Sequence, residues 1–165
     1  MESEKPTPFQ KQIAAALGID ISHDTKGVAA ARIHTFVGPA IHSKAAQYTA
    51  TERQIDFARS LGLEVMGDSS LVASAKIADE LNIRNKAALE KLQLQPGDRV
   101  RVRHQFEFDG ETREWVQESV ICSIQPNCRI MFKGGNGRGA WPTQVEKIVG
   151  LPDMMTAPPI LPQQG

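Results

Sequence analysis

The sequence has few cysteines and few aromatic residues, and it has neither an excess of charge nor a long apolar run. Its 165 residues include two cysteines, Cys122 and Cys128. Two cysteines without a secretory signal do not make a disulfide scaffold, so we expect both thiols to be reduced. No apolar run approaches the roughly 20 residues that a membrane helix needs, and the polar start MESEKPTPF has no signal-peptide core. We therefore expect a soluble cytoplasmic protein without membrane contact.

The chain has no overall excess of basic residues, which would have favoured a nucleic-acid partner. Lysine and arginine together number 19, and so do aspartate and glutamate. A nucleic-acid site would therefore depend on the local placement of a few cations. The four histidines have no cysteine or carboxylate at ligand spacing: His23, His34, His42 and His104. We also find no nucleophile or acid–base motif, so we expect no catalysis, no metal and no cofactor.

The first half of the chain contains one pattern twice. The segments TPFQKQIAAALGIDI (7–21) and TERQIDFARSLGLEV (51–65) align without a gap at a shift of 44 positions. The match continues downstream, where Asp24 aligns with Asp68 and Ile33 with Ile77. A match of this length predicts a tandem repeat with copies at 7–50 and 51–93. One copy has too little core to be stable alone, so we expect the two copies to pack on each other.

Each copy is predicted to contain two or three helices. The Thr-x-x-Gln motif is a capping box, so helices are expected over 8–17 and 52–61, ended by glycine. Asp24 and Asp68 are expected to cap a second helix. The first helices should bury Ile13, Ala14 and Leu17, and Phe57, Ala58 and Leu61. The second helices should bury Ala29, Ile33 and Val37, and Ala73, Ile77 and Leu81. A third short helix is expected at 41–48 and at 85–92.

The second half changes to the alternation that is typical of strands. After a Pro-Gly turn at 94–98, residues 99–108 alternate between two sides. One side has Val100, Val102, His104, Phe106 and Phe108, and the other has Arg99, Arg101, Arg103, Gln105 and Glu107. Asp109-Gly110 predicts a hairpin turn. REWVQESVICSIQ predicts a bulged second strand, CRIMFKG a third, and AWPTQVEKI a short last strand with a closing turn.

These strands resemble the small SH3-like and Tudor-like barrels over about Leu94 to Ile148. The resemblance is carried by PGDRVRV, SVICSI, RIMFKGG and GAWPTQVEKI. The helical unit is similar to small modules appended to bacterial and phage DNA-processing proteins. We thus expect an α+β chain with an all-α tandem repeat over 7–93 and an SH3/Tudor-like β-barrel over 94–149. Residues 1–6 and the proline-rich residues 150–165 are expected to be disordered.

The row of arginines on the first strand is the strongest electrostatic feature. Arg99, Arg101 and Arg103 would form a ladder some 14 Å long, at about 3.4 Å per residue, suited to a phosphate backbone. The alternative is a solvated sheet face on which the arginines pair with Glu114 or Glu118.

Two further features are candidates for contacts with nucleic acid. Lys133 and Arg138 flank a glycine-rich loop whose amides can approach phosphate oxygens, although a plain hairpin loop has the same composition. Trp115, Phe132 and Trp141 can form an aromatic platform or cage, or fill the core; for Phe132 the core is favoured.

The sequence therefore predicts a non-catalytic protein that binds DNA or RNA, or an adaptor. Its predicted contacts are Arg99, Arg101, Arg103, Lys133, Arg138, Trp115 and Trp141. The alternative is a protein–protein interaction module that grips a partner through the repeat or the barrel. A PxxP motif at 159–162 adds a possible docking peptide. The oligomeric state cannot be read from the sequence.

Overall fold

The protein is α+β, as predicted. The structure, a computed structural model, describes residues 4–41, 48–134 and 138–149. The chain divides into a helical unit, residues 1–87, and a sheet unit, residues 88–165. The boundary lies inside a helix rather than at Leu94, where the sequence predicted it. The predicted tail at 150–165, and most of the predicted helix at 41–48, lie outside the described residues.

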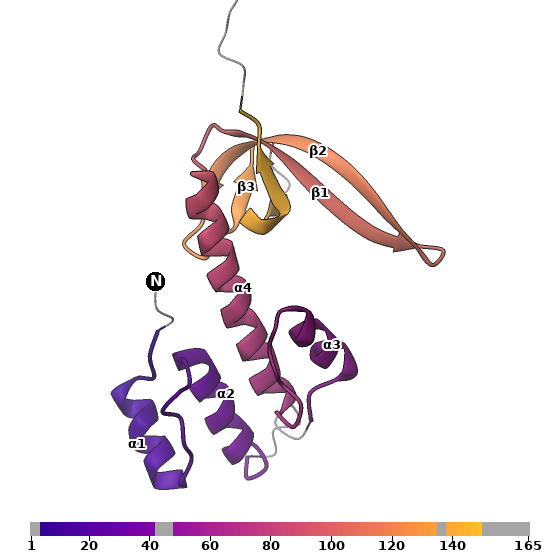
Figure 1. Ribbon diagram of the computed structural model, residues 1–165. Helices are drawn as coiled ribbons and strands as arrows, with labels where there is room; N and C mark the ends of the chain where they lie inside the picture. Colours follow the sequence, from indigo (N-terminus) through magenta and orange to yellow (C-terminus); the bar gives the residue numbers. More distant parts are fainter. Residues whose placement is uncertain (1–3, 42–47, 135–137, 150–165) are drawn as a thin grey trace, which may run out of the picture. The chain divides into compact units, whose positions relative to one another are not determined.

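Two helices of the helical unit, one in each half, are capped in the same way. The helices of the described residues are α1 (Pro8–Leu17), α2 (Lys26–Val37), α3 (Glu52–Ser60) and α4 (Ser70–Leu92), whose end enters the sheet unit (Figure 1). Thr7 caps α1 and Thr51 caps α3. The backbone N–H of each threonine donates to the glutamine three residues later at 2.9 Å. Both predicted capping boxes are confirmed.

The second helices begin one residue later than predicted. Thr25 caps α2, and its hydroxyl accepts a hydrogen bond from the N–H of Val28. Ser69 makes the same contact with Val72 before α4. The predicted caps Asp24 and Asp68 instead form ion pairs, with Arg32 at 2.8 Å and with Lys76 at 2.6 Å. The two capping residues, the two aspartates and their two cationic partners are each separated by 44 positions, which is the shift of the repeat.

Two small cores stabilise the helical unit. One contains Ala14, Ile21 and Ala29, and the other contains Ala58, Val65, Ala73 and Ile77. Of the positions predicted to be buried, Ala14, Ala29, Ala58, Ala73 and Ile77 are buried, and the others are partly buried except Phe57, which is 47% exposed. The helix predicted at 85–92 is not separate, because α4 continues through it for 23 residues. Residues 4–6 were expected to be disordered, but Pro6 is buried and the carbonyl of Glu4 accepts from the N–H of Lys26.

The described residues of the sheet unit form five antiparallel strands in the order β4-β3-β2-β1-β5. The strands are β1 (Arg99–Phe108), β2 (Glu111–Ile124), β3 (Ile130–Phe132), β4 (Gly139–Ala140) and β5 (Val145–Lys147), with a 3₁₀ turn, η2 (Pro142–Gln144), before β5. The predicted closed barrel is not confirmed. Among the described residues no pairing joins β4 to β5, so the sheet is open, and these two strands are its edges.

One side of the sheet covers the core of this unit. Val100 and Val102 of β1, Ile121 of β2 and Ile130 of β3 are at most 1% exposed. Leu89 and Leu92, at the end of α4, pack against this cluster. The side chains of β1 that continue on this side past Val102 are His104, Phe106 and Phe108, and they are progressively less covered. The alternation predicted from the sequence therefore places the core and His104 on one side.

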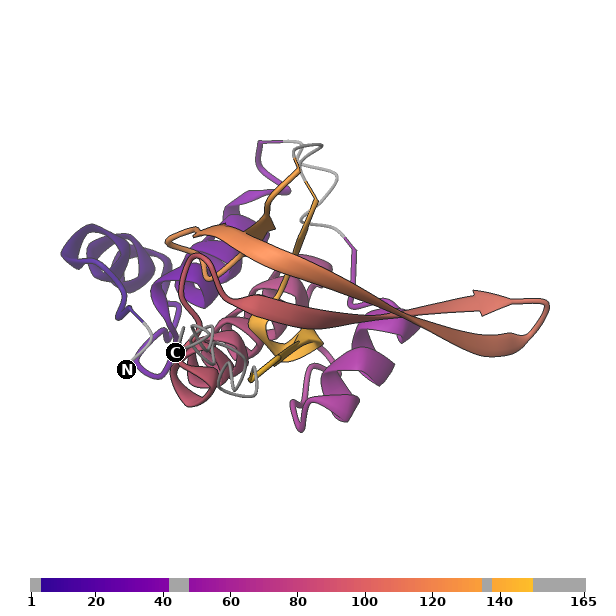
Figure 2. The same cartoon turned by 90° about the horizontal axis from the view of Figure 1, so that it is seen from above.

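The first hairpin projects beyond the other strands. Asp109 and Gly110 both have positive φ, 55° and 74°, which is the turn type that Asp-Gly favours. β5 pairs only with residues 100–102 of β1, and β3 only with residues 121–124 of β2. We call the two-stranded remainder, residues 103–116, the arm; its twisted ribbon is seen in Figure 2. The predicted bulge in β2 lies between Ile121 and Ser123.

Neither cysteine is in a disulfide, as the sequence predicted. Cys122 is exposed and Cys128 is buried, and both are free. Among the residues that the structure describes, no helix combines the length and apolarity that a membrane-spanning segment needs.

Candidate functional site

The predicted arginine ladder lies on the solvent side of the sheet, and every member is paired. The guanidinium groups of Arg99 and Arg101 both donate to Glu118, at 3.1 Å and 3.3 Å. The alternative interpretation of these arginines, ion pairs across the hairpin, is therefore the one that the structure contains.

Arg103 is held by two carboxylates. It donates to Glu114 at 3.3 Å and to Glu146 of β5 at 2.7 Å. The hydrogen bond to Glu146 raises the pKa of Arg103, and the charges of both carboxylates act in the same direction. Three arginines thus meet three glutamates, and the ladder is electrically neutral as a whole.

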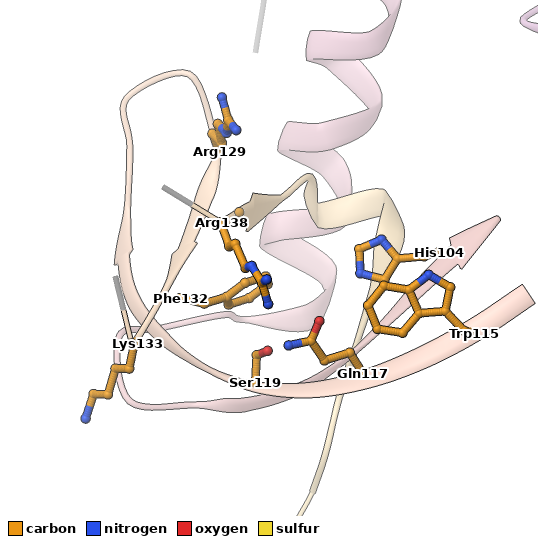
Figure 3. Close-up of a pocket in the computed structure, with 10 residues that line it drawn as sticks. His104, Trp115, Gln117, Ser119, Arg129, Phe132, Lys133 and Arg138 are labelled. Carbon is orange, nitrogen blue, oxygen red and sulfur yellow. The ribbon is translucent and has the colours of Figure 1, made fainter. Parts of the chain in front are cut away.

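A groove of about 580 Å³ lies on the opposite side of the sheet, next to the core (Figure 3). Strands β1 and β2 contribute His104, Trp115, Gln117 and Ser119. The segment around β3 and the start of β4 contribute Arg129, Phe132, Lys133 and Arg138. Residues far apart in the sequence therefore line one groove, because β3 pairs with the end of β2 next to the arm.

An aromatic stack lies at one end of the groove. His104 and Trp115 are directly opposite in the β1–β2 ladder, and their ring centroids are 4.2 Å apart with an interplanar angle of 15°. Opposite residues on one face of an antiparallel pair have neighbouring Cβ atoms, so the register itself produces this contact. Trp115 remains 46% exposed, which leaves much of its ring accessible to a planar ligand.

Three cations border the groove. Arg138 points toward its interior, whereas Arg129 and Lys133 lie toward its rim (Figure 3). No carboxylate is among the described residues that line the groove, and none of the described carboxylates pairs with these three side chains. Their charge is therefore not neutralised within the described part of the sheet unit, in contrast to the arginines on the other side.

The structure brings together three of the seven residues predicted from the sequence: Trp115, Lys133 and Arg138. Trp141 does not line the groove; it is half-buried, and its backbone N–H donates to the side-chain oxygen of Gln144 at 2.9 Å. Residues 135–137 of the glycine-rich loop between the two predicted cations lie outside the described residues.

Sequence reasoning missed several residues of the groove. The alternation of β1 had placed His104 on the side of Val100 and Val102, but His104 was not predicted as a contact. Phe132 was assigned to the core; it packs against the core and also lines the groove. No sequence motif indicated the other three residues of the groove, Arg129, Gln117 and Ser119. Their place in the groove depends on how β2 pairs with its neighbouring strands.

The described residues contain no group of three or more histidine, cysteine, aspartate or glutamate side chains that could hold a metal ion. Comparison with protein families, with curated proteins and with solved structures found no match to this chain.

Proposed function

We propose that the protein binds nucleic acid without catalysis, and that the groove of the sheet unit is the binding site. One observation carries this proposal: a stacked aromatic pair and three cations without carboxylate partners share one groove. Aromatic platforms next to positive charge are the general features of sites for single-stranded nucleic acid, because every base has a π-face and every nucleotide has a phosphate.

The residues of the groove suggest a division of roles. A base stacks on the exposed face of Trp115, which His104 supports from the other side. Arg138 contacts the attached phosphate, and Arg129 and Lys133 contact its neighbours. Gln117 and Ser119 supply hydrogen bonds between these two ends of the groove. A stacking site of this kind needs an unpaired base, so we propose a preference for single strands over duplex.

The proposed site differs from the arginine ladder that the sequence favoured. Contacts through Arg99, Arg101 and Arg103 would require phosphates to displace Glu114, Glu118 and Glu146. Exchanging one charged partner for another yields less than contacts with cations that have no partner. The groove is therefore the better candidate.

We also propose two relationships of fold. The helical unit is a tandem duplication, supported by the paired capping boxes and the paired ion pairs at a shift of 44 positions. The sheet unit is a relative of the SH3-like and Tudor-like small barrels, supported by its long first hairpin, its bulged second strand and the turn before its last strand.

A protein–protein interaction module remains the competing function. Exposed apolar side chains on the helical unit favour it: Phe9, Phe36, Tyr48, Phe57 and Met66. Such a module predicts no salt-sensitive binding to any nucleic acid, and it predicts that Trp115 matters only for a protein ligand.

A titration with labelled oligonucleotides separates the two functions. Fluorescein-labelled single-stranded and duplex DNA are titrated with the protein at several salt concentrations. Three phosphate contacts predict a slope of log affinity against log salt near −2 for a single strand, at about −0.7 per contact. Trp115→Ala is expected to weaken single-strand binding by about 1–3 kcal/mol and to leave the circular dichroism spectrum unchanged. Affinity weaker than about 10⁻⁴ M for every nucleic acid at low salt would contradict the proposal.

A further inference from the structure

The inner side of the sheet continues past the groove along the arm. Phe106 and Phe108 of β1 follow His104 at alternate positions, and they are 45% and 58% exposed. Across the ladder, Arg113 lies opposite Phe106, and its guanidinium carbon is 4.9 Å from the ring centroid of Phe108. The arm thus extends the aromatic and cationic character of the groove toward its tip.

The two sides of the sheet unit differ in charge. By strand alternation and groove lining, the described residues of the inner side include five cations, Arg113, Arg129, Lys133, Arg138 and Lys147, and one carboxylate, Glu111; Lys147 is paired with Asp98 of the preceding turn. The outer side has three arginines and four glutamates: Glu107, Glu114, Glu118 and Glu146. A polyanion is therefore complementary to the inner side and not to the outer side.

The spacing of the rings suits an unstacked strand. Phe106 and Phe108, two positions apart on β1, are separated by about 6.8 Å, and Trp115 of β2 lies diagonally across the ladder from Phe106, at about 7–8 Å. These distances are about twice the 3.4 Å step between stacked bases in one strand of a duplex. A stretched single strand can present one base to each ring, whereas the bases of a duplex cannot separate in this way. The ribbon twists along its length, so the bound strand would wind with it (Figure 2).

We propose that the arm lengthens the groove into a track for single-stranded nucleic acid, on which successive bases stack on Trp115, Phe106 and Phe108. Arg113 contacts a phosphate near the tip. The three rings hold three successive bases, and the cations of the groove contact further phosphates, so the track takes about four nucleotides or more. This inference rests on the proposed function of the groove.

A length series of oligonucleotides tests the track. Fluorescein-labelled oligothymidylates of 2, 4, 6 and 8 nucleotides are titrated with the full chain and with the double variant Phe106→Ser/Phe108→Ser. The wild-type affinity is expected to rise with length up to about 6 nucleotides. The double variant is expected to lose at most one stacked base with the dinucleotide but two with the hexanucleotide. Because each stacked base contributes about 1–3 kcal/mol, the hexanucleotide is expected to bind at least tenfold more weakly, and its loss is expected to exceed that of the dinucleotide.

The chain offers a matched control on the other side of the arm. Val116 is 49% exposed and lies opposite Arg103, so Val116→Ser removes a similarly exposed apolar side chain from the outer side. It is expected to leave binding at every length unchanged. Arg113→Gln is a second test that removes no apolar core: it is expected to flatten the salt dependence of hexanucleotide binding by about one contact and not that of the dinucleotide.

The outcomes separate this inference from the function of the groove. If the double variant and Arg113→Gln bind every length as the wild type does, while Trp115→Ala loses binding, the track is wrong and the groove stands. An equal loss for Val116→Ser would also overturn the track, because the effect would then not depend on the inner side. If the wild type binds no oligothymidylate of any length, both the track and the proposed function are wrong.

Discussion

The hydroxyl oxygen of Thr35 lies 2.6 Å from the hydroxyl oxygen of Ser69. The 44-position shift of the repeat aligns Thr35 with Asp79 and Ser69 with Thr25. Asp79 and Thr25 are hydrogen-bonded as well, with the Thr25 hydroxyl donating to the Asp79 carboxylate. The contact between the two halves of the helical unit is therefore reciprocal, as in a two-fold symmetric dimer, where residue i meets j and j meets i.

The Thr35–Ser69 pair predicts a measurable coupling between the two halves. Thr35 donates to the carbonyl of Ala31, so Ser69 is the donor between the two hydroxyls. In a double-mutant cycle of Thr35→Val and Ser69→Ala, we expect a coupling of about 0.5–1.5 kcal/mol in the free energy of unfolding. Urea unfolding followed by far-ultraviolet circular dichroism measures it.

The single variants are expected to differ. Ser69→Ala also removes the cap on the N–H of Val72, which costs about 1 kcal/mol more. Strict additivity of the two substitutions would mean that the contact contributes nothing to the packing of the halves.

Gly139 is expected to tolerate no side chain. A Cβ atom at this position would lie 2.5 Å from the carbonyl oxygen of Ile130, a backbone atom of the neighbouring strand. Gly139→Ala is expected to destabilise the sheet unit by about 1–3 kcal/mol, since β4 must move away from β3. The two tryptophans, Trp115 and Trp141, both lie in the sheet unit, so their fluorescence during urea unfolding reports on this unit.

A glycine of the helical unit serves as the control. A Cβ atom on Gly27 would meet its nearest neighbours at 3.8 Å and 3.9 Å, which are ordinary contacts. Gly27→Ala is expected to leave the tryptophan transition unchanged. If Gly139→Ala unfolds at the same midpoint urea concentration as the wild type, as followed by tryptophan fluorescence, the substitution does not destabilise the sheet unit and this prediction is wrong.

The sequence predicted the local structure of the helical unit well because that structure depends on short-range chemistry. The capping boxes need only a threonine and a glutamine three residues apart, and both form. The separate helix at 85–92 was wrong because no breaker stops α4 before it, so the helix simply continues. The first residue of the second helices was also wrong, since Thr25 and Ser69 compete with the preceding aspartates for the cap, and those aspartates are held in ion pairs.

The candidate site was predictable only in part. Trp115, Lys133 and Arg138 were named from their chemistry, but their common location depends on which strands pair and in which register. The neutral state of the arginine ladder depends on Glu146, which is 43 residues away from Arg103 in the sequence. The open sheet differs from the expected barrel because barrel closure needs a pairing between the first and last strands of the order, and local patterns do not encode it.

Asp98 is expected to make the stability of the sheet unit depend on pH in acid. The hydrogen bond from Lys147 lowers the pKa of Asp98, and the N–H of Gln95 also donates to the carboxylate, at 2.8 Å. A carboxyl whose pKa is lowered in the folded state stabilises the fold above its unfolded pKa, near 3.9, and this contribution is lost as the pH falls through the lower folded pKa.

The size of the effect is small, about 1 kcal/mol or less for a pair near the surface. Asp98→Asn removes the titration, so the variant is expected to be less stable than the wild type at pH 6 and equally stable near pH 2. Tryptophan fluorescence during urea unfolding at both pH values measures the difference. A constant difference between the two proteins at all pH values would show that the ionised form of Asp98 has no advantage.

The contrast between paired and unpaired arginines gives the sharpest test of the binding site. Arg101 is 46% exposed in its side chain and donates to Glu118, whereas Arg138 lines the groove without a carboxylate partner among the described residues. Arg138→Ala is expected to weaken single-strand binding and to flatten the slope of log affinity against log salt by about 0.7. Arg101→Ala is expected to change neither, because the phosphate contacts lie on the other side of the sheet.

Both variants remove one positive charge from the same sheet, so the comparison separates local contact from net charge. If the two variants weaken binding equally, the protein attracts the polyanion through its overall charge, and the groove is not the site. If Arg101→Ala flattens the slope and Arg138→Ala does not, the phosphates displace the glutamates, and the ladder predicted from the sequence is the binding surface after all. A larger loss for Arg138→Ala, together with a loss for Trp115→Ala, is the result expected if base stacking and phosphate contact occur in the same groove.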